Sequence, residues 1–152
     1  MPNASVGPIL PPVGTTNCRP EITKATPTEF VLINRAKQSN FIIGELVNRQ
    51  LSFIVENLPK DGSGCPGKWM FSEMMKHFGS GVSAIEGLWV GSLSDNLAVA
   101  NALSATGLAL EEAAKATWTG KQAASWGFTQ VHVVSAKGTT GKYTMVRVLF
   151  SK

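Results

Sequence analysis

The side chains best suited to chemistry lie in the last 25 residues of the chain. Two segments with alternating valines, "FTQVHVVS" and "YTMVRVLF", are typical of β-strands, and the turn-rich sequence "AKGTTG" joins them. Alternation places the valines on one face of the predicted sheet and polar side chains on the other. The polar set consists of Gln130, His132, Tyr143 and Arg147.

This set of residue types fits the cleavage of RNA without a metal ion. The 2′-hydroxyl attacks the adjacent phosphorus, a base removes its proton, cations stabilise the charged phosphorane, and an acid protonates the leaving oxygen. One histidine needs help from tyrosine, lysine or water to supply both acid and base. The expected hairpin register places His132 opposite Met145 or Arg147. The alternative interpretation is an ordinary polar sheet face that is exposed to water.

The segment "TWTGKQAASW" looks like a phosphate-binding loop because a Gly-Lys pair follows a hydroxyl residue. A nucleotide-binding loop of that type needs glycine at position 115, where this chain has lysine, so no ATP site is expected. Thr119 is predicted to begin a helix in a capping box with Gln122. A helix N-terminus opened by Gly120, with Lys121 beside it, also suits an RNA phosphate.

The predicted ribonuclease site therefore has two parts, and no cofactor is expected. The catalytic candidates are His132, Arg147, Tyr143 and Lys121, and the substrate-binding candidates are Thr119, Gly120 and Gln130.

Metal ligands and a disulfide are not expected from the sequence. The two cysteines and two histidines lack metal-ligand spacing. Glu73 and His77 lie four residues apart on a predicted helix and would form half a metal site, but an exposed helix face is the favoured interpretation. Cys18 and Cys65 are interpreted as incidental thiols, because one lies in a proline-rich arm and the other in a glycine-rich loop.

The elements that position these residues indicate an α+β fold, with N-terminal helices followed by an antiparallel β-sheet. Residues 1–26 are predicted to be a flexible linker or arm, and residues 27–152 a single globular domain. A stripe of apolar residues at helical spacing predicts a helix from about residue 43 to 58. Further helices are predicted at 69–78, after Ser94 or Asp95, and at 108–117. Strands are predicted at 84–90, 128–135 and 143–150.

The same alternation predicts which side chains form the core. The expected core residues are Val131, Val133, Val146, Val148 and Phe150, with Trp89 and Leu103 nearby. The net charge of +4 and the isoelectric point near 9.3 favour a polyanionic partner. No apolar run is long enough to span a membrane, and the N-terminus lacks a signal peptide, so export would require a larger carrier protein.

Several features of the C-terminal half carry a resemblance to a known class. They are Gly87 and Trp89 ahead of Ser94-Asp95-Asn96, the 111–114 helix, Thr117 to Gly120, Gly127-Phe128 and Tyr143-Thr144. With these features, residues 84–152 resemble C-terminal toxin domains of bacterial polymorphic toxins, of the Rhs and contact-dependent inhibition types. The resemblance implies secretion as part of a larger carrier, action in the target-cell cytoplasm, and a cognate immunity protein.

That class includes nucleases, deaminases and NAD-consuming enzymes. The shortage of histidines disfavours HNH and zinc nucleases, and the lack of paired cysteines disfavours a cytidine deaminase. A metal-independent ribonuclease in the style of barnase, EndoU, colicin or RelE is the favoured function. One alternative is an ADP-ribosyltransferase or NAD glycohydrolase that uses Glu111, Glu112, Tyr143 and the "TWTG" segment at 117–120. The other is a non-enzymatic binding module in which Trp89, Trp118 and Trp126 only fill the core.

Overall fold

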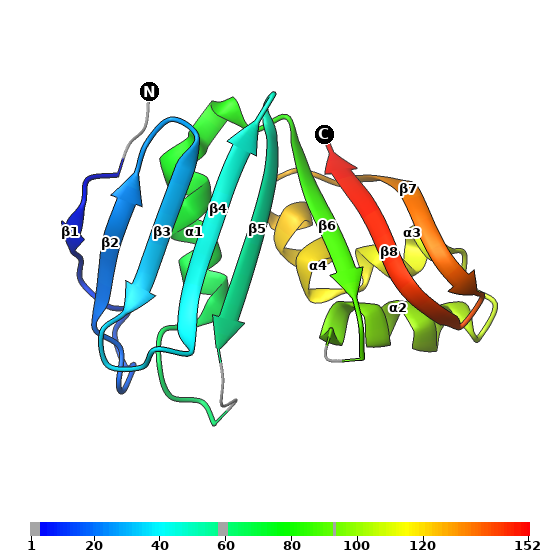
Figure 1. Cartoon of the computed structure of the whole chain (residues 1–152), viewed down its shortest axis with the longest axis horizontal. Helices are drawn as coiled ribbons and strands as arrows, with labels where there is room; N and C mark the ends of the chain where they lie inside the picture. The colour runs from blue at the N-terminus through cyan, green and yellow to red at the C-terminus, as the bar shows by residue number, and fades with distance from the viewer. Residues whose placement is uncertain (1–3, 58–60, 93) are drawn as a thin grey trace. The chain divides into compact units, whose positions relative to one another are not determined.

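The computed structural model describes residues 4–57, 61–92 and 94–152 (Figure 1). The chain forms two compact units, Met1–Val82 and Ser83–Lys152, where the sequence indicated one domain from residue 27 onward. Both units combine antiparallel strands with helices, so the α+β class is confirmed.

The first unit pairs five antiparallel strands in the order of the sequence. Helix α1 (Gly67–Phe78) covers one face of this sheet, and the short turn η1 (Gly79–Gly81) follows it. The strands are β1 (Gly7–Pro8), β2 (Pro20–Ala25), β3 (Glu29–Asn34), β4 (Asn40–Val47) and β5 (Gln50–Asn57).

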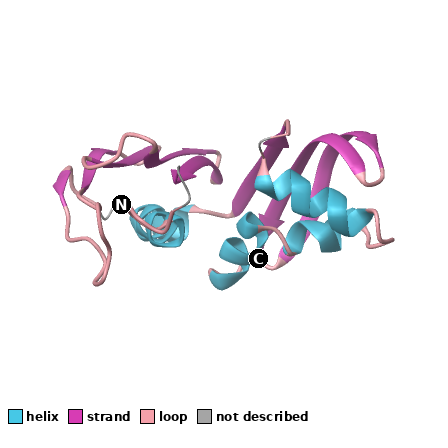
Figure 2. Cartoon of the chain, turned by 90° about the horizontal axis from the view of Figure 1, so that it is seen from below, coloured by secondary structure: helices cyan, strands magenta, loops and turns pink. Residues whose placement is uncertain are grey.

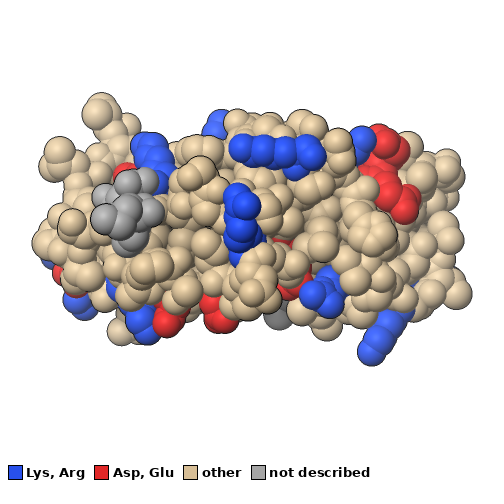
Figure 3. All heavy atoms as spheres, turned by 90° about the horizontal axis from the view of Figure 1, so that it is seen from above, with Lys and Arg blue, Asp and Glu red and all other residues tan. Residues whose placement is uncertain are grey.

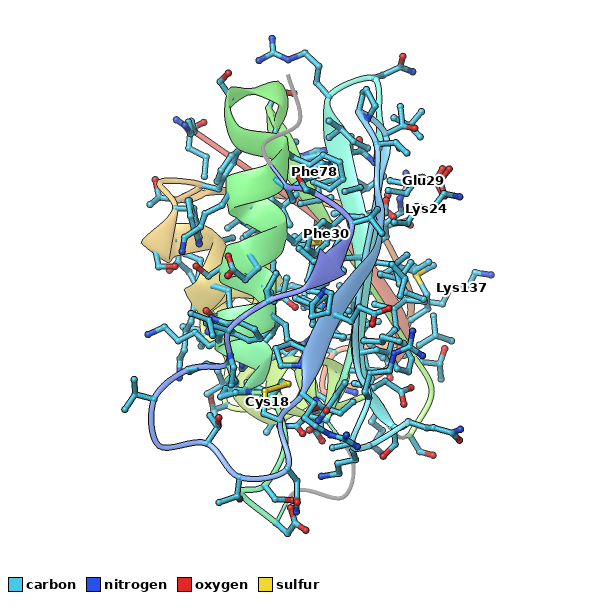
Figure 4. All side chains as sticks on the ribbon, turned by 90° about the vertical axis from the view of Figure 1, so that its left-hand side faces the viewer. Cys18, Lys24, Glu29, Phe30, Phe78 and Lys137 are labelled. Carbon is cyan, nitrogen blue, oxygen red and sulfur yellow. A yellow bond between two sulfur atoms is a disulfide. The ribbon has the colours of Figure 1, made fainter. Side chains whose placement is uncertain are left out.

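The core of the first unit lies between α1 and the strands. Phe30 and Phe78 both point into this layer, from β3 and α1 (Figure 4). Gly44 of β4 allows close approach of the helix, because a Cβ atom there would clash with the sulfur of Met74. The prediction of a helix at 69–78 that ends at Gly79 is confirmed, and Gly79 has the positive φ of 55° common at helix ends.

The prediction of N-terminal helices is wrong. The segment expected to be helical from residue 43 to 58 belongs to the β4–β5 hairpin. Its two-residue turn, Asn48 and Arg49, has φ values of 50° and 64°, which match the right-handed twist of paired strands. Ile43, Val47 and Ile54 of the expected stripe are 43%, 53% and 58% exposed, so the helical spacing does not correspond to a buried face.

The expected flexible arm at residues 1–26 is partly structured. Pro20–Ala25 forms β2, which pairs with β3. Cys18 is bonded to Cys65 as a disulfide that joins positions 47 residues apart, so the interpretation of both cysteines as incidental thiols is wrong. The loops that carry them are distant in sequence, and only the folded unit brings them together.

The second unit contains three antiparallel strands in the order β6-β8-β7, with three helices on one face of the sheet (Figure 2). The predictions of strands at 84–90, 128–135 and 143–150, and of helices in the intervening sequence, are confirmed in outline. The elements are β6 (Ala84–Val90), α2 (Asp95–Ser104), α3 (Leu110–Lys115), α4 (Trp118–Ser125), β7 (Gln130–Thr139) and β8 (Lys142–Ser151).

The core of the second unit follows the predicted alternation on the central strand. Val146, Val148 and Phe150 are at most 1% exposed, and Trp89 is 4% exposed. Gly87 lets the Trp89 indole lie across β6, because a Cβ atom at residue 87 would come within 2.9 Å of the ring. The three other predicted core residues are only half-buried: Val131 and Val133, which lie on the outermost strand of this sheet, and Leu103.

Candidate functional site

The face of the second sheet that the helices do not cover carries Glu86, His132 and Arg147. In the strand register, Leu149 of β8 lies between Glu86 of β6 and His132 of β7. Arg147 occupies the next row, between Leu88 and Ser135. Paired residues of neighbouring strands point to the same face, so the three functional side chains lie in two adjacent rows.

The expected position of His132 in the hairpin is wrong. His132 pairs with Leu149, because β7 continues to Thr139 and the turn at 140–141 lies later in the chain than the centre of the expected six-residue connection. Register shifts between Lys137 and Gly138 and between Val133 and Ser135 offset each other, so the register at His132 is the one that the turn sets. His132 and Arg147 are therefore diagonal neighbours on one face, a spacing that long side chains span.

Glu86 and Arg147 form a cross-strand ion pair. Both Nε and Nη2 of Arg147 lie 2.8 Å from Oε2 of Glu86. The side chain of Glu86 is only 13% exposed and that of Arg147 43%. The charge-assisted hydrogen bond from Nε, together with the ion-pair contact of Nη2, fixes the orientation of the guanidinium group. A phosphate that approached from solvent would meet a cation already held in position.

Two further polar residues of β7 lie on the same sheet face as Glu86, His132 and Arg147. Gln130 is exposed and pairs with Ser151, one row beyond His132. Lys137 pairs with Met145 at the other end of the strand, and its side chain extends away from the sheet (Figure 4). We refer to Glu86, Gln130, His132, Lys137 and Arg147 as the open-face cluster.

Tyr143 is not brought together with His132. It lies four residues before Arg147 on β8, which corresponds to about 13 Å along a strand. Its backbone N–H donates to Oδ1 of Asn101, at 2.7 Å, and its carbonyl accepts from Nδ2 of Asn101, at 2.9 Å. Tyr143 also lines an open pocket of about 340 Å³ together with Leu97 and Asn101 of α2.

The predicted capping box at Thr119 is wrong. Thr117 is the N-cap of α4, and its hydroxyl accepts from the N–H of Gly120 at 3.0 Å. Thr119 lies inside the helix, where its hydroxyl accepts from Nδ2 of Asn96 at 3.0 Å and its N–H donates to Oδ1 of Asn96 at 3.3 Å. Thr117 makes the cap because it, and not Thr119, has the extended backbone that precedes a helix.

The expected phosphate site at the start of α4 does not lie with the open-face cluster. The N–H groups of Thr119 and Gly120 already have partners, and both residues are buried. Gly120 serves packing, because a Cβ atom there would lie 2.7 Å from the carbonyl oxygen of Lys115. Lys121 is exposed, but α4 belongs to the layer of helices on the opposite side of the sheet (Figure 2).

His77 is a buried core residue, and the half metal site with Glu73 is not formed. Its Nδ1 accepts from the N–H of Ala4 at 3.2 Å, and its Nε2 lies 2.7 Å from the carbonyl oxygen of Thr26. The ring is 0% exposed, so the expected exposed helix face is wrong at this position. Among the described residues, no group of three or more His, Cys, Asp or Glu side chains is placed to hold a metal ion.

The residues of the alternative functions are placed as follows. Glu111 and Glu112 lie exposed in the first turn of α3, and Glu112 pairs with Lys115 at 3.1 Å. Trp118 and Trp126 are half-buried. Over the face drawn in Figure 3, the described lysines and arginines are scattered among uncharged residues.

Glu86 is the functional candidate that the sequence interpretation missed. Its signal is present in "AIEGLWV", where Glu86 alternates with Ile85, Gly87 and Trp89 and so must face away from the core. The proximity to Arg147 is not visible in the sequence, because 61 residues separate the two.

Comparison with known proteins adds no family to this description. No protein-family model matches the chain, and neither the curated proteins nor the solved structures contain a significant match. Among the described helices, none has the length and apolar character needed to cross a membrane.

Proposed function

We propose that the second unit is a toxin domain that cleaves RNA without a metal ion, through Glu86, His132 and Arg147. The observation that carries the proposal is the strand register, which places a carboxylate, an imidazole and a guanidinium in adjacent rows of one uncovered sheet face. Glu86 supplies the second acid–base group that His132 alone lacks. Delivery by a larger carrier, action in the target-cell cytoplasm and neutralisation by an immunity protein are part of the same proposal.

Each residue has a distinct role in the proposed reaction. Glu86 removes the proton of the 2′-hydroxyl as that oxygen attacks phosphorus, and His132 donates a proton to the leaving 5′-oxygen. Arg147 stabilises the negative charge of the phosphorane. Gln130 and Lys137 lie along β7 on either side of His132, where they would contact neighbouring nucleotides. Tyr143, Thr119, Gly120 and Lys121 have no role in the reaction.

The test is to incubate the chain with RNA in the presence of EDTA and to follow both RNA and NAD. We expect products with 2′,3′-cyclic phosphate ends and an unchanged amount of NAD. Glu86→Gln and His132→Ala should each lower the rate about 10²- to 10⁴-fold, and Arg147→Lys about 10²- to 10³-fold because the paired donors are lost.

Lys121→Gln is the matched control, because it removes one exposed positive charge from the helix side of the same unit. It should cleave RNA at the wild-type rate. Loss of NAD with intact RNA would replace this proposal with the NAD-consuming alternative. Full activity in a folded His132→Ala variant would exclude RNA cleavage through Glu86, His132 and Arg147.

A further inference from the structure

We propose that the Cys18–Cys65 disulfide is a reversible redox switch, which is reduced and re-forms while the first unit stays folded. The bond joins the segment that leads into β2 to the loop that precedes α1 (Figure 4). Cys18 is 7% exposed and Cys65 0%. This inference concerns the first unit and goes beyond the proposed ribonuclease activity of the second.

Asn40 holds the backbone of Cys65 independently of the sulfur atoms. Its Oδ1 accepts from the N–H of Cys65 at 2.6 Å, and its Nδ2 donates to the carbonyl oxygen of Cys65 at 3.0 Å. Asn40 is fully buried at the start of β4 and pairs with Asn57 of β5. The sheet thus positions Cys65 through one side chain whether or not the disulfide is present.

Asn34 holds the residues on either side of Cys18 in the same way. Its Nδ2 donates to the carbonyl oxygen of Asn17 at 2.7 Å, and its Oδ1 accepts from the N–H of Arg19 at 2.9 Å. Asn34 also donates to Oδ1 of Asn40 at 2.9 Å, so the two side chains form one buried network. A third link runs directly between the segments, because the N–H of Gly64 donates to the carbonyl oxygen of Thr16 at 2.7 Å.

These hydrogen bonds imply that the two thiols stay adjacent after reduction. A low-molecular-weight disulfide such as oxidised glutathione then re-forms the Cys18–Cys65 disulfide in two exchange steps. A local opening of the two segments first exposes one of the buried sulfurs. Its thiolate attacks the reagent and releases one glutathione, and the other cysteine attacks the mixed disulfide and releases the second. The protein loses two electrons and two protons, and the reagent accepts them as two thiols. Disulfides persist in oxidising compartments, and in a reducing cytosol the glutathione buffer sets the fraction of chains in which the Cys18–Cys65 bond is reduced.

The experiment measures how strongly folding favours formation of the Cys18–Cys65 disulfide. The full chain is equilibrated in glutathione buffers of defined ratio, with and without denaturant, approached from the oxidised and the reduced side. Free thiols are alkylated and counted by mass. We expect the effective concentration of the two thiols to be about 10³-fold higher in the folded chain, because folding has already closed the loop. Equal values in the folded and unfolded chain would overturn the proposal.

A pair of variants tests the role of the asparagine network. Asn34→Ser should lower the effective concentration in the folded chain about tenfold, since one side of the network is lost. Asn101→Ser is the matched control, because Asn101 binds the N–H and carbonyl of Tyr143 in the second unit, and it should leave closure unchanged. If the Asn34→Ser variant does not fold, the comparison of the folded and denatured wild-type chain still tests the proposal. An Asn34→Ser variant that folds and closes like wild type would refute the positioning role.

Discussion

Removal of the Cys18–Cys65 disulfide should destabilise the first unit by about 4 kcal/mol. The bond closes a loop with a sequence separation of 47 residues. The chain-entropy relation for such a loop gives about 14 cal/mol/K, or about 4 kcal/mol at 25 °C, that the disulfide removes from the unfolded ensemble. Because stabilities of whole domains are only about 5–15 kcal/mol, this loss is a large fraction of the total.

The assay is urea unfolding of the Cys18→Ala/Cys65→Ala double variant, followed through amide signals of β3 and α1. Alanine is used because both cysteines are buried, and a serine hydroxyl would need a new hydrogen-bond partner. Wild type in reductant should unfold at the same urea concentration as the double variant, and reductant should have no effect on the variant. A loss below about 1 kcal/mol, or a reductant effect on the variant, would refute the reasoning.

Two further predictions concern a helix cap and a loop carboxylate. Thr117→Ala should lower the free energy of unfolding by about 0.5–2 kcal/mol because α4 loses its N-cap. Gln122→Ala should lower it much less in the same thermal denaturation measurement. Equal losses would support the capping box at Thr119 instead. The hydroxyl of Ser63, with its N–H and the nearby Lys37, lowers the pKa of Asp61 to about 2. Because the folded-state pKa is lowered, this carboxylate stabilises the fold above about pH 4 and loses that effect as the pH falls towards 2. Ser63→Ala should raise the pKa of Asp61 towards its ordinary value in an NMR titration, and an unchanged titration would contradict the assignment.

Local patterns were sufficient to predict most of the second unit. Alternating valines identified β7 and β8, and the buried residues Val146, Val148 and Phe150 follow from the same period of two. Ser94 was one of two predicted caps for α2, and its side chain does accept from the N–H of Leu97. These signals are readable because each depends on residues only two to four positions apart.

The sequence of the first unit is ambiguous because its apolar residues fit two periods at once. The run from Phe41 to Leu58 contains apolar side chains at helical spacing and also at every second position. The helical spacing predicts a helix, but the Asn48-Arg49 turn and the pairing of β4 with its neighbours select the strand. Hydrogen bonds between strands are tertiary interactions, so they do not appear in the local pattern.

The sequence by itself determined the α+β class, the strands of the second unit and the face on which His132 and Arg147 lie. Only the tertiary structure decided which distant groups meet: Glu86 with Arg147 across 61 residues, His77 with Thr26 across 51, and Cys18 with Cys65 across 47. The physical reason is that periodicity specifies which way a side chain points, whereas its partner depends on strand order, register and loop closure. Those are properties of the whole packed unit.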